Sequence, residues 1–408
     1  MNAADQTLKD IARQVLSHAK AGTMELADEV MRLPASHYYD PVRFEQEVAR
    51  VIKRVPLILG PSAEIPQPGD YKTLRVADTS IVVTRDAAGK ANAFINACSH
   101  RGARLVWEEA GRRSRFTCPY HGWSFSNTGE LLAVAAEDDF GQINKCDHGL
   151  IRLPVYERAG LIWGTLNPDS KLDMPAFLCG YDELLNAFGF DDWVFVSKRT
   201  FKGPNWKLAY DGYLEYYHVP VLHKDTFGRD STKRGLYFHW GPHQHIKSTD
   251  TTPGHVATET LGYMTDLLDQ PEADWDPEVL TYGVWTVFPT TSIASFGVCG
   301  RGVMISQILP GEHVNESITT QYFIMAEPPA DPEAAEATFD FFKEVVMQED
   351  YAMGHSAGET LKGSGVKHIL FGRNELGNQH FHRWIDAFLE AEDDAAMMTL
   401  LKASMTVG

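Results

Sequence analysis

The chain has 408 residues, and its 37 Lys or Arg against 55 Asp or Glu give a net charge of −18. This negative excess argues against a protein that mainly coats nucleic-acid backbones. With 44% hydrophobic residues the chain can bury a sizeable core, and its length is enough for two or three domains. No run approaches the ~18 consecutive apolar residues of a membrane span. Five scattered cysteines and an acidic N-terminus predict a reduced, cytoplasmic protein without a disulfide framework.

The first 54 residues predict two helices. Apolar residues recur on one helical face between Leu8 and Ala19. Asp40 followed by Pro41 is typical of a helix start, because an acid caps the first turn and proline suits the first helical position. The buried face of this second helix is expected to carry Phe44, Val48, Val51 and Ile52.

The remaining chain divides into a β-rich part and a mixed part. Short β-rich runs separated by Gly, Pro and Asp predict an antiparallel domain up to about residue 167. Further strands are then expected at 281–287, 291–296, 303–309 and 319–326. A long helix is predicted from Asp331-Pro332 to about Gly354, and strands beside segregated helices indicate an α+β fold. The expected segments are N-terminal helices over 1–54, a β domain over 55–167 and an α+β domain over 168–408.

Two Cys/His pairs form the strongest motif. Cys98-Ser99-His100 and Cys118-Pro119-Tyr120-His121 each place one thiolate and one imidazole in a short loop, and 17 residues separate the pairs. A structural zinc finger would group its cysteines and its histidines separately, which makes zinc the weaker interpretation. Four residues that bind nothing would be improbable in a chain with five cysteines. The remaining interpretation is a [2Fe–2S] cluster with Cys98 and Cys118 on one iron and His100 and His121 on the other.

A second motif places titratable residues in an aromatic segment. On a continuous helix, Asp211, Glu215 and His218 would lie within ~60° of one another, which is costly for buried groups unless they bind each other or a metal. His218 and His223 are five residues apart and would diverge by ~140° on the same helix. Pro220 disfavours helix at the preceding residue, so the chain could turn there and bring the two histidines together.

A carboxylate would complete the two-histidine, one-carboxylate set of non-haem iron oxygenases. Candidates lie in the long C-terminal helix at Glu349 and Asp350. Helical periodicity puts both acids near the apolar stripe of that helix and does not choose between them. The stripe is expected to contain Phe339, Phe342, Val346 and Met353.

Together these motifs resemble the alpha subunits of Rieske non-haem iron oxygenases. The resemblance rests on the Cys/His pairs, each followed closely by glycine, and on Asn205-Trp206-Lys207, an acid, and Glu-x-x-His-x4-His. It implies an antiparallel Rieske domain over 55–167 and a helix-grip catalytic domain over 168–408. It also implies a Rieske [2Fe–2S] cluster, a mononuclear Fe(II) on His218 and His223, and Asp350 as the third ligand. The tail histidines His380 and His382 are interpreted as structural or surface residues.

One position departs from the family pattern. The family usually has aspartate three residues before the first iron histidine, and this chain has Glu215. The resemblance makes that carboxylate a link between a Rieske histidine and an iron histidine across a subunit boundary, here His121–Glu215–His218. Glutamate at this position also occurs in relatives that act on quaternary amines, which widens the range of substrates. The alternative role for Glu215 is to orient His218. We include Asp211, the acid of the motif, with Glu215 as a candidate catalytic residue.

The resemblance implies a terminal oxygenase that uses O2 and electrons from NAD(P)H. A reductase, with or without a ferredoxin, would supply the electrons, and a homotrimer is the expected assembly. The substrate would be an aromatic or other small organic molecule, which is mono- or dioxygenated or demethylated. An electron carrier or redox sensor without oxygenase activity is the alternative. Candidate pocket residues, most of them expected in the core, are Tyr210, Tyr213, Leu222, Trp285, Phe288 and Phe296.

Five arginines lie in or near the Cys/His loops of this acidic chain, at positions 101, 104, 112, 113 and 115. A positive rim could steer an acidic redox partner toward the cluster. A solvated loop with scattered charge is an equally good interpretation. Neither a nucleic acid nor a membrane is expected as a partner.

Overall fold

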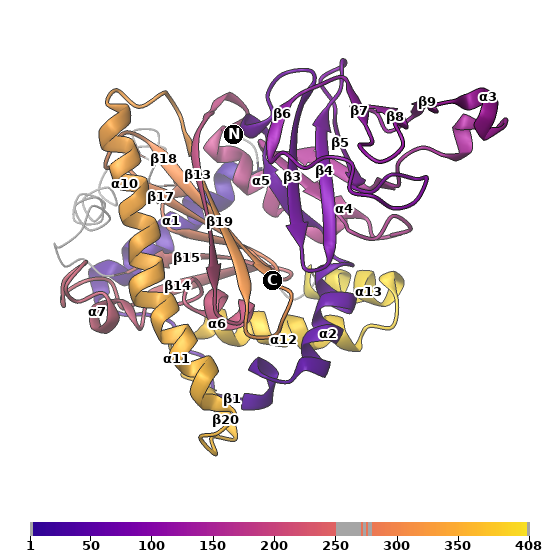
Figure 1. Cartoon of the computed structure of the whole chain (residues 1–408). Coiled ribbons are helices and arrows are strands. Elements are labelled where there is room, and N and C mark those ends of the chain that lie inside the picture. The colour runs from indigo at the N-terminus through magenta and orange to yellow at the C-terminus, as the bar shows by residue number, and fades with distance from the viewer. Residues whose placement is uncertain (1–2, 250–270, 272–274, 276–279, 406–408) are drawn as a thin grey trace.

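The structure is a computed structural model that describes residues 3–249, 271, 275 and 280–405 (Figure 1). It has the α+β fold that the sequence predicts, with antiparallel sheets and segregated helices. Among the described residues, every helix is too short or too polar to cross a lipid bilayer. All five cysteines are free thiols.

The N-terminal helices form as predicted. Helix α1 (Ala3–Ala21) buries the apolar face between Leu8 and Ala19. Helix α2 (Pro41–Glu47) is capped by Asp40, whose side chain accepts a hydrogen bond from the Val42 amide, and a π-helical turn (Val48–Ile52) continues it. Both segments pack on the C-terminal half of the chain, since α1 contacts Leu236 and the π-helical turn contacts helix α12 (Leu376–Glu390).

Three small antiparallel sheets form the β-rich part between residues 57 and 164. The largest has the strand order β10-β5-β4-β3-β6, the second β11-β12-β2 and the third β7-β8-β9. Their bounds are β2 Leu57–Pro61, β3 Asp70–Val76, β4 Thr79–Arg85, β5 Ala91–Ile95, β6 Ala110–Arg112, β7 Arg115–Thr117, β8 Ser124–Ser126, β9 Leu131–Ala133, β10 Arg152–Leu153, β11 Val155–Arg158 and β12 Leu161–Gly164. A short helix, α3 (Glu137–Phe140), lies on an arm that extends away from these sheets (Figure 1).

One large antiparallel sheet organises the C-terminal half. Its order within the described residues is β13-β19-β18-β17-β16-β15-β14. The bounds are β13 Val194–Gly203, β14 Gly235–Trp240, β15 His243–Ser248, β16 Val284–Val287, β17 Thr291–Phe296, β18 Gly302–Pro310 and β19 Ser317–Met325. Side chains alternate across the sheet: Phe323 and Met325 pack with Phe339 of the long helix, whereas Tyr322 and Ile324 join the main core.

Helices line the large sheet and connect its parts. The segments before the long helix are α4 (Met174–Leu178), α5 (Tyr181–Leu185), α6 (Trp206–Asp211) and α7 (Val219–Leu222). The long helix consists of α10 (Pro332–Val345), a π-helical turn (Val346–Asp350) and α11 (Tyr351–Leu361), and crosses the molecule beside the sheet (Figure 1). Helix α13 (Asp394–Met405) follows α12, and β1 (Met31–Pro34) pairs with β20 (His368–Phe371).

The long helix differs from the sequence prediction in two ways, and the π-helical turn accounts for the second. The helix continues to Leu361 instead of ending near Gly354. Phe339 and Val346 are buried as predicted, but Met353 is 54% exposed. A π turn inserts one extra residue into an α-helix and therefore rotates all following side chains by ~100°. Simple 3.6-residue periodicity fails beyond residue 346 for this reason.

A buried ion pair joins the N-terminal helices to the motif Asn205-Trp206-Lys207. The ammonium of Lys207 donates to both carboxylate oxygens of Glu47, and the two side chains are 1% and 0% exposed. Arg43 donates to Glu47 as well, at 2.8 Å. Burial lowers the pKa of Lys207, so this cation depends on its carboxylate partner for charge compensation.

We expect Glu47→Ala to destabilise the protein strongly, because it leaves Lys207 buried without its carboxylate. Removing one partner of a buried pair costs about 3–5 kcal/mol. Urea unfolding followed by circular dichroism measures the loss. Glu45→Ala, which truncates an exposed glutamate on the same helix, is the matched control and should change the unfolding midpoint little. Equal midpoints for the two variants would contradict the role given to this pair.

Candidate metal centres

The helix predicted over Asp211, Glu215 and His218 ends early, because residues 212–218 form turns and bends between α6 and α7. Asn205 caps α6 by accepting hydrogen bonds from the amides of Lys207 and Leu208, and the helix ends at Asp211. Pro220 lies in the first turn of α7 and starts that short helix instead of interrupting a long one. The predicted consequence holds nevertheless, because the rings of His218 and His223 lie with their centroids 5.2 Å apart.

Three predicted side chains converge on one point. Ligand atoms of His218, His223 and Asp350 all lie within 4.8 Å of one another. The carboxylate Oδ1 of Asp350 is 3.5 Å from Nε2 of His218 and 3.3 Å from Nε2 of His223. Asp350 is the last residue of the π-helical turn, so the irregular turn and the third member of the set coincide. π turns in helices are often found at functional sites.

The neighbouring acid Glu349 lies on the other side of His223. Its Oε2 is 2.8 Å from Nδ1 of that imidazole, and its Oε1 accepts a hydrogen bond from the hydroxyl of Thr226. The two acids, which periodicity does not distinguish, therefore lie differently around the histidines. Asp350 faces the Nε2 atoms of both histidines, and Glu349 faces the Nδ1 atom of one.

A second glutamate, Glu215, contacts Nδ1 of His218 as Glu349 contacts Nδ1 of His223. Glu215 bonds Nδ1 of His218 through one oxygen and accepts from the His218 amide, at 3.0 Å, through the other. A carboxylate at Nδ1 keeps the proton on that atom and leaves Nε2 as an acceptor. Each histidine therefore presents Nε2 toward Asp350 as a potential metal ligand.

The electrostatics of this set suit a cation. Burial by itself lowers the pKa of His218, but Glu215 and Asp350 outweigh that effect, and the net pKa is raised. Burial also lowers the pKa of His223, and Asp350 and Glu349 again raise it beyond the ordinary value. Two imidazoles and a carboxylate in a negative surrounding match the donor set of mononuclear non-haem iron.

Asp211 lies in a different network. Its Oδ2 accepts from the hydroxyl of Tyr38 at 2.5 Å, and its Oδ1 is 2.9 Å from Nε2 of His382. His382 is 1% exposed, in agreement with the structural role expected for it. Asp211 therefore connects α6 to α12 and to the N-terminal segment, and its role as a catalytic residue stays a prediction.

The four residues of the Cys/His pairs come from two loops of the same design. In each loop the carbonyl of the cysteine accepts from a glycine amide four residues later, Cys98 from Gly102 at 2.8 Å and Cys118 from Gly122 at 3.0 Å. Both glycines have positive φ, 73° and 69°, a conformation that other residues rarely adopt. The rings of His100 and His121 lie with centroids 4.8 Å apart.

These loops fit a [2Fe–2S] cluster held by two thiolates and two imidazoles. Cys98 and Cys118 are 3% and 2% exposed, and burial raises the pKa of the Cys98 thiol, so a metal would be needed to stabilise the thiolates. Trp123 stacks on His100 at 4.8 Å. Its buried indole N–H has no hydrogen-bond acceptor among the described residues, as expected where a non-protein group completes the site.

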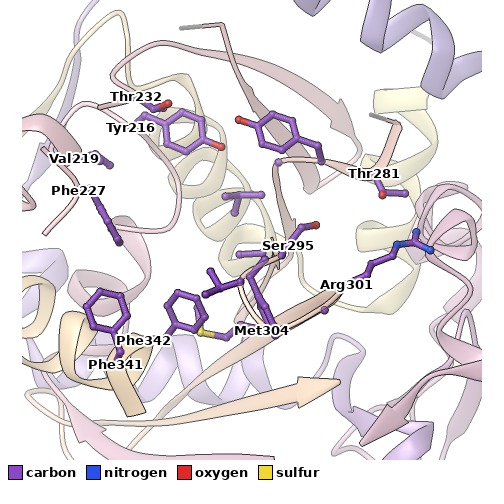
Figure 2. A pocket seen from close by; sticks show the side chains of 18 of the residues that line it. Tyr216, Val219, Phe227, Thr232, Thr281, Ser295, Arg301, Met304, Phe341 and Phe342 are labelled. Atoms are coloured by element: carbon purple, nitrogen blue, oxygen red, sulfur yellow. The ribbon is translucent and has the colours of Figure 1, made fainter. Parts of the chain in front are cut away.

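A cavity of about 540 Å³ lies beside the second set of residues. Its wall includes Val219, which follows His218, and Phe227, whose ring centroid is 5.2 Å from that of His223. Figure 2 shows Val219 and Phe227 on one side of the cavity and Thr281 and Arg301 on the other. Of the predicted pocket residues, Phe296 lines this cavity. Tyr210, Trp285 and Phe288 are core residues instead.

Two family models match separate parts of the chain. The first, described as "Rieske [2Fe-2S] domain", matches residues 56–157. The second, "Ring hydroxylating alpha subunit (catalytic domain)", matches residues 190–391. The chain belongs to the Rieske non-haem iron oxygenase alpha subunits. The cofactors of this Rieske oxygenase are the [2Fe–2S] cluster and mononuclear iron that both donor sets fit.

Relatives of this Rieske oxygenase act on different classes of compound. The large subunit of 2-halobenzoate 1,2-dioxygenase from Burkholderia cepacia is 32% identical over 47% of this chain and 44% of its own length. The oxygenase subunit of glycine betaine monooxygenase from Chromohalobacter salexigens is 31% identical over 47% of this chain and 43% of its own length. The alpha subunit of biphenyl 2,3-dioxygenase from Rhodococcus jostii is 34% identical over 49% and 45%. The matched segments span less than half the length of these relatives.

Solved structures share the fold over nearly the whole chain. The quaternary ammonium Rieske monooxygenase CntA has a TM-score of 0.73 and 20% identity, and the match covers 89% of this chain and 96% of that one. Naphthalene 1,2-dioxygenase from Rhodococcus sp. has a TM-score of 0.72 and 21% identity over 93% of this chain and 98% of that one. At this level of identity the comparison establishes the fold.

Sequence reasoning missed the residues that support the histidines from outside the motifs. Glu349 was recognised only as an alternative ligand, and Thr226 was not singled out. The available signal was the position of Thr226 three residues after His223, which places both in one turn of the chain. The contact between this turn and the distant Glu349 depends on tertiary packing, which one sequence does not display.

We expect Asp350→Ala and Glu349→Gln to affect metal binding differently. Asp350→Ala removes a member of the donor set and should abolish retention of mononuclear iron. Glu349→Gln should retain the iron with an affinity about 10- to 100-fold lower, as is typical when a hydrogen bond to a metal-bound histidine is weakened. Iron analysis after dialysis against graded chelator measures both effects. Gln348→Ala, which changes the exposed preceding residue, is the control. Full iron retention by Asp350→Ala would refute the assignment.

Proposed function

We propose that this chain is the terminal component of an oxygenase system that hydroxylates a small, largely apolar organic substrate. The observation that carries the proposal is the cavity, whose wall shares a turn of the chain with His223. Oxygen chemistry at this position would act directly on a molecule bound in the cavity. O2 is the co-substrate, and the electrons originate from NAD(P)H through a reductase, with or without a ferredoxin.

The residues divide this work between two sites. Cys98, His100, Cys118 and His121 would hold the cluster. His218, His223 and Asp350 would hold the mononuclear iron. When bound, these groups supply one-electron transfer and activation of dioxygen. Glu215 and Glu349 keep the Nδ1 protons on the histidines, and the aromatic wall of the cavity orients the substrate and keeps water away.

The cavity supports an aromatic or other apolar substrate over a quaternary amine. Among the described lining residues there is no carboxylate, and the charged one is Arg301. A quaternary ammonium ion would need compensating negative charge or an enclosing aromatic cage in a low-dielectric site. The wall does contain aromatic rings, but Arg301 lies over the ring of Trp193, 5.3 Å from its centroid, and its charge would repel a quaternary ammonium ion. Phe227, Phe296 and Phe342 add apolar surface that suits an aromatic substrate. Whether the product is a diol, a monohydroxylated compound or a demethylated compound depends on the substrate.

A Rieske electron carrier or redox sensor without oxygenase activity is the second candidate. It is favoured by the completeness of the Cys/His loops, which need nothing from the rest of the chain to hold a cluster. It does not account for the convergence of His218, His223 and Asp350 beside a cavity. The two candidates differ in iron content, because the carrier needs only the two cluster atoms.

The assembly we propose is a homotrimer in which the two sites of different subunits meet. Figure 1 shows α7 on the opposite side of the molecule from the β7–β9 sheet that carries the second cluster loop. Large apolar side chains are exposed at both places: Tyr217 and Val221 beside the histidine pair, and Trp107 and Tyr120 near the cluster loops. Contact between these surfaces would cover them and place His121 of one subunit near Glu215 of the next. We also place the enzyme in the cytoplasm.

His218→Ala tests the oxygenase proposal. We expect this variant to lose product formation and mononuclear iron while the visible and paramagnetic spectra of the cluster stay unchanged. Oxygen uptake with a small panel that includes naphthalene, benzoate and glycine betaine, combined with product analysis, measures the activity. His380→Ala is the matched control, because His380 lies outside the donor set on α12. Full activity of His218→Ala would exclude this metal centre as the site of oxygenation.

The arginines near the cluster loops predict an effect on electron delivery. Arg112 and Arg113 are exposed and pair with Asp70 and Glu108. The double variant Arg112→Glu, Arg113→Glu should slow reduction of the cluster by a reductase about tenfold at low salt, because steering by charge is lost. Reduction by dithionite should be unaffected. The control is Arg75→Glu, which changes an exposed residue on β3. Equal slowing of cluster reduction by the reductase and by dithionite would contradict a role of Arg112 and Arg113 in docking the reductase.

A further inference from the structure

A chain of hydrogen bonds leads from the cavity wall to a metal-binding histidine. Thr226 lines the cavity, and its hydroxyl donates to Oε1 of Glu349. The other oxygen, Oε2, lies 2.8 Å from Nδ1 of His223. We call Thr226, Glu349 and His223 the relay. It connects the space that would hold substrate with the group that would hold iron, and it uses no residue of the sequence motifs other than His223.

The relay is short because its ends lie on the same turn of the chain. The amides of Thr226 and Phe227 both donate to the carbonyl of His223, the former at 3.1 Å. The ring of Phe227, another wall residue, lies 5.2 Å from that of His223. Glu349 comes from the opposite side, on the π-helical turn, next to Asp350. A molecule in the cavity therefore contacts residues one turn away from the metal ligand.

Glu349 is the acceptor for both ends of the relay. A threonine hydroxyl has one proton, and in the structure that proton goes to Glu349. Glu349 in turn accepts from Nδ1–H of His223. The side chain of Glu349 is 24% exposed, whereas that of His223 is 5% exposed, so water can reach the carboxylate but hardly the imidazole. Hydrogen bonds to a carboxylate strengthen when the surrounding water is removed.

We propose that the relay couples occupation of the cavity to metal binding at His218, His223 and Asp350. An apolar ligand displaces water from beside Thr226, so its hydroxyl donates to Glu349 alone and fixes the carboxylate where Oε2 accepts from Nδ1–H of His223. The imidazole is then held with Nε2 toward the metal position. The occupied protein then holds Fe(II) more tightly than the empty one. Linkage requires the reciprocal effect, so loading Fe(II) tightens ligand binding by the same factor. The inference rests on the proposed function for the identity of the metal and the cavity.

The test measures release of mononuclear Fe(II) to ferrozine from the reduced holoenzyme, without and with saturating naphthalene. The cluster is monitored by its visible absorption in the same sample. For the wild-type protein we expect naphthalene to slow release at least about fivefold, the lower end of typical coupling between sites. In Thr226→Val, which keeps the shape but loses the hydroxyl, the rate should change less than twofold on adding naphthalene. Thr226→Ser should restore the response.

Thr232→Val is the matched control. Thr232 lines the same cavity, but its hydroxyl pairs with Ser248 at 2.9 Å and not with Glu349. This variant should respond to naphthalene as the wild type does. A merely structural effect of Thr226→Val would alter the basal release rate and leave the response to naphthalene intact.

Three results would overturn the proposal. They are no response to naphthalene in the wild type, a full response in Thr226→Val, or an equal loss of response in Thr232→Val. In the reciprocal equilibrium measurement, a naphthalene dissociation constant that is the same with and without mononuclear Fe(II) would likewise contradict the linkage. Because no turnover is required, failure of the oxygenase proposal is detected separately, as absence of product from an enzyme that retains its iron.

Discussion

The hydrogen bonds that Glu215 and Glu349 accept from two imidazoles are the interactions on which this site depends. An imidazole can offer either of its nitrogens, and two histidines five residues apart have no intrinsic reason to offer the same one. A carboxylate at each Nδ1 removes that freedom and leaves both Nε2 atoms directed at Asp350. Glu215 lies three residues before the histidine that it contacts, whereas Glu349 lies more than a hundred residues after its histidine. The catalytic half of the fold can be understood as the framework that holds them.

The features that the sequence predicted are those with local causes. The Cys/His loops are short and repeat one backbone design, so spacing alone identifies them. The start of α2 follows from Asp40 and Pro41, and the antiparallel strands follow from alternation and turn residues. The family resemblance then supplied His218, His223 and Asp350 as a set, and the structure brings these three together.

The features that sequence reasoning could not supply have distant or irregular causes. The run from Val346 to Asp350 gives no sign of a π turn, because it contains no glycine or proline that would mark an irregularity. A continuous helix would place Asp211 on the same stripe as Glu215, but α6 ends at Asp211, whose carboxylate contacts Tyr38 and His382. The boundaries of the domains follow from composition only to within several residues.

The π turn also bears on how this chain should be compared with others. A π turn is an α-helix with one additional residue, so it can be lost by a single deletion without loss of the helix. Two chains could then align well on both sides of residues 346–350 while differing in which side chain faces the histidines. A one-residue gap at residues 346–350 therefore changes which side chain faces the two histidines. An alignment that puts the gap outside this helix would match Asp350 to a residue that does not face the histidines.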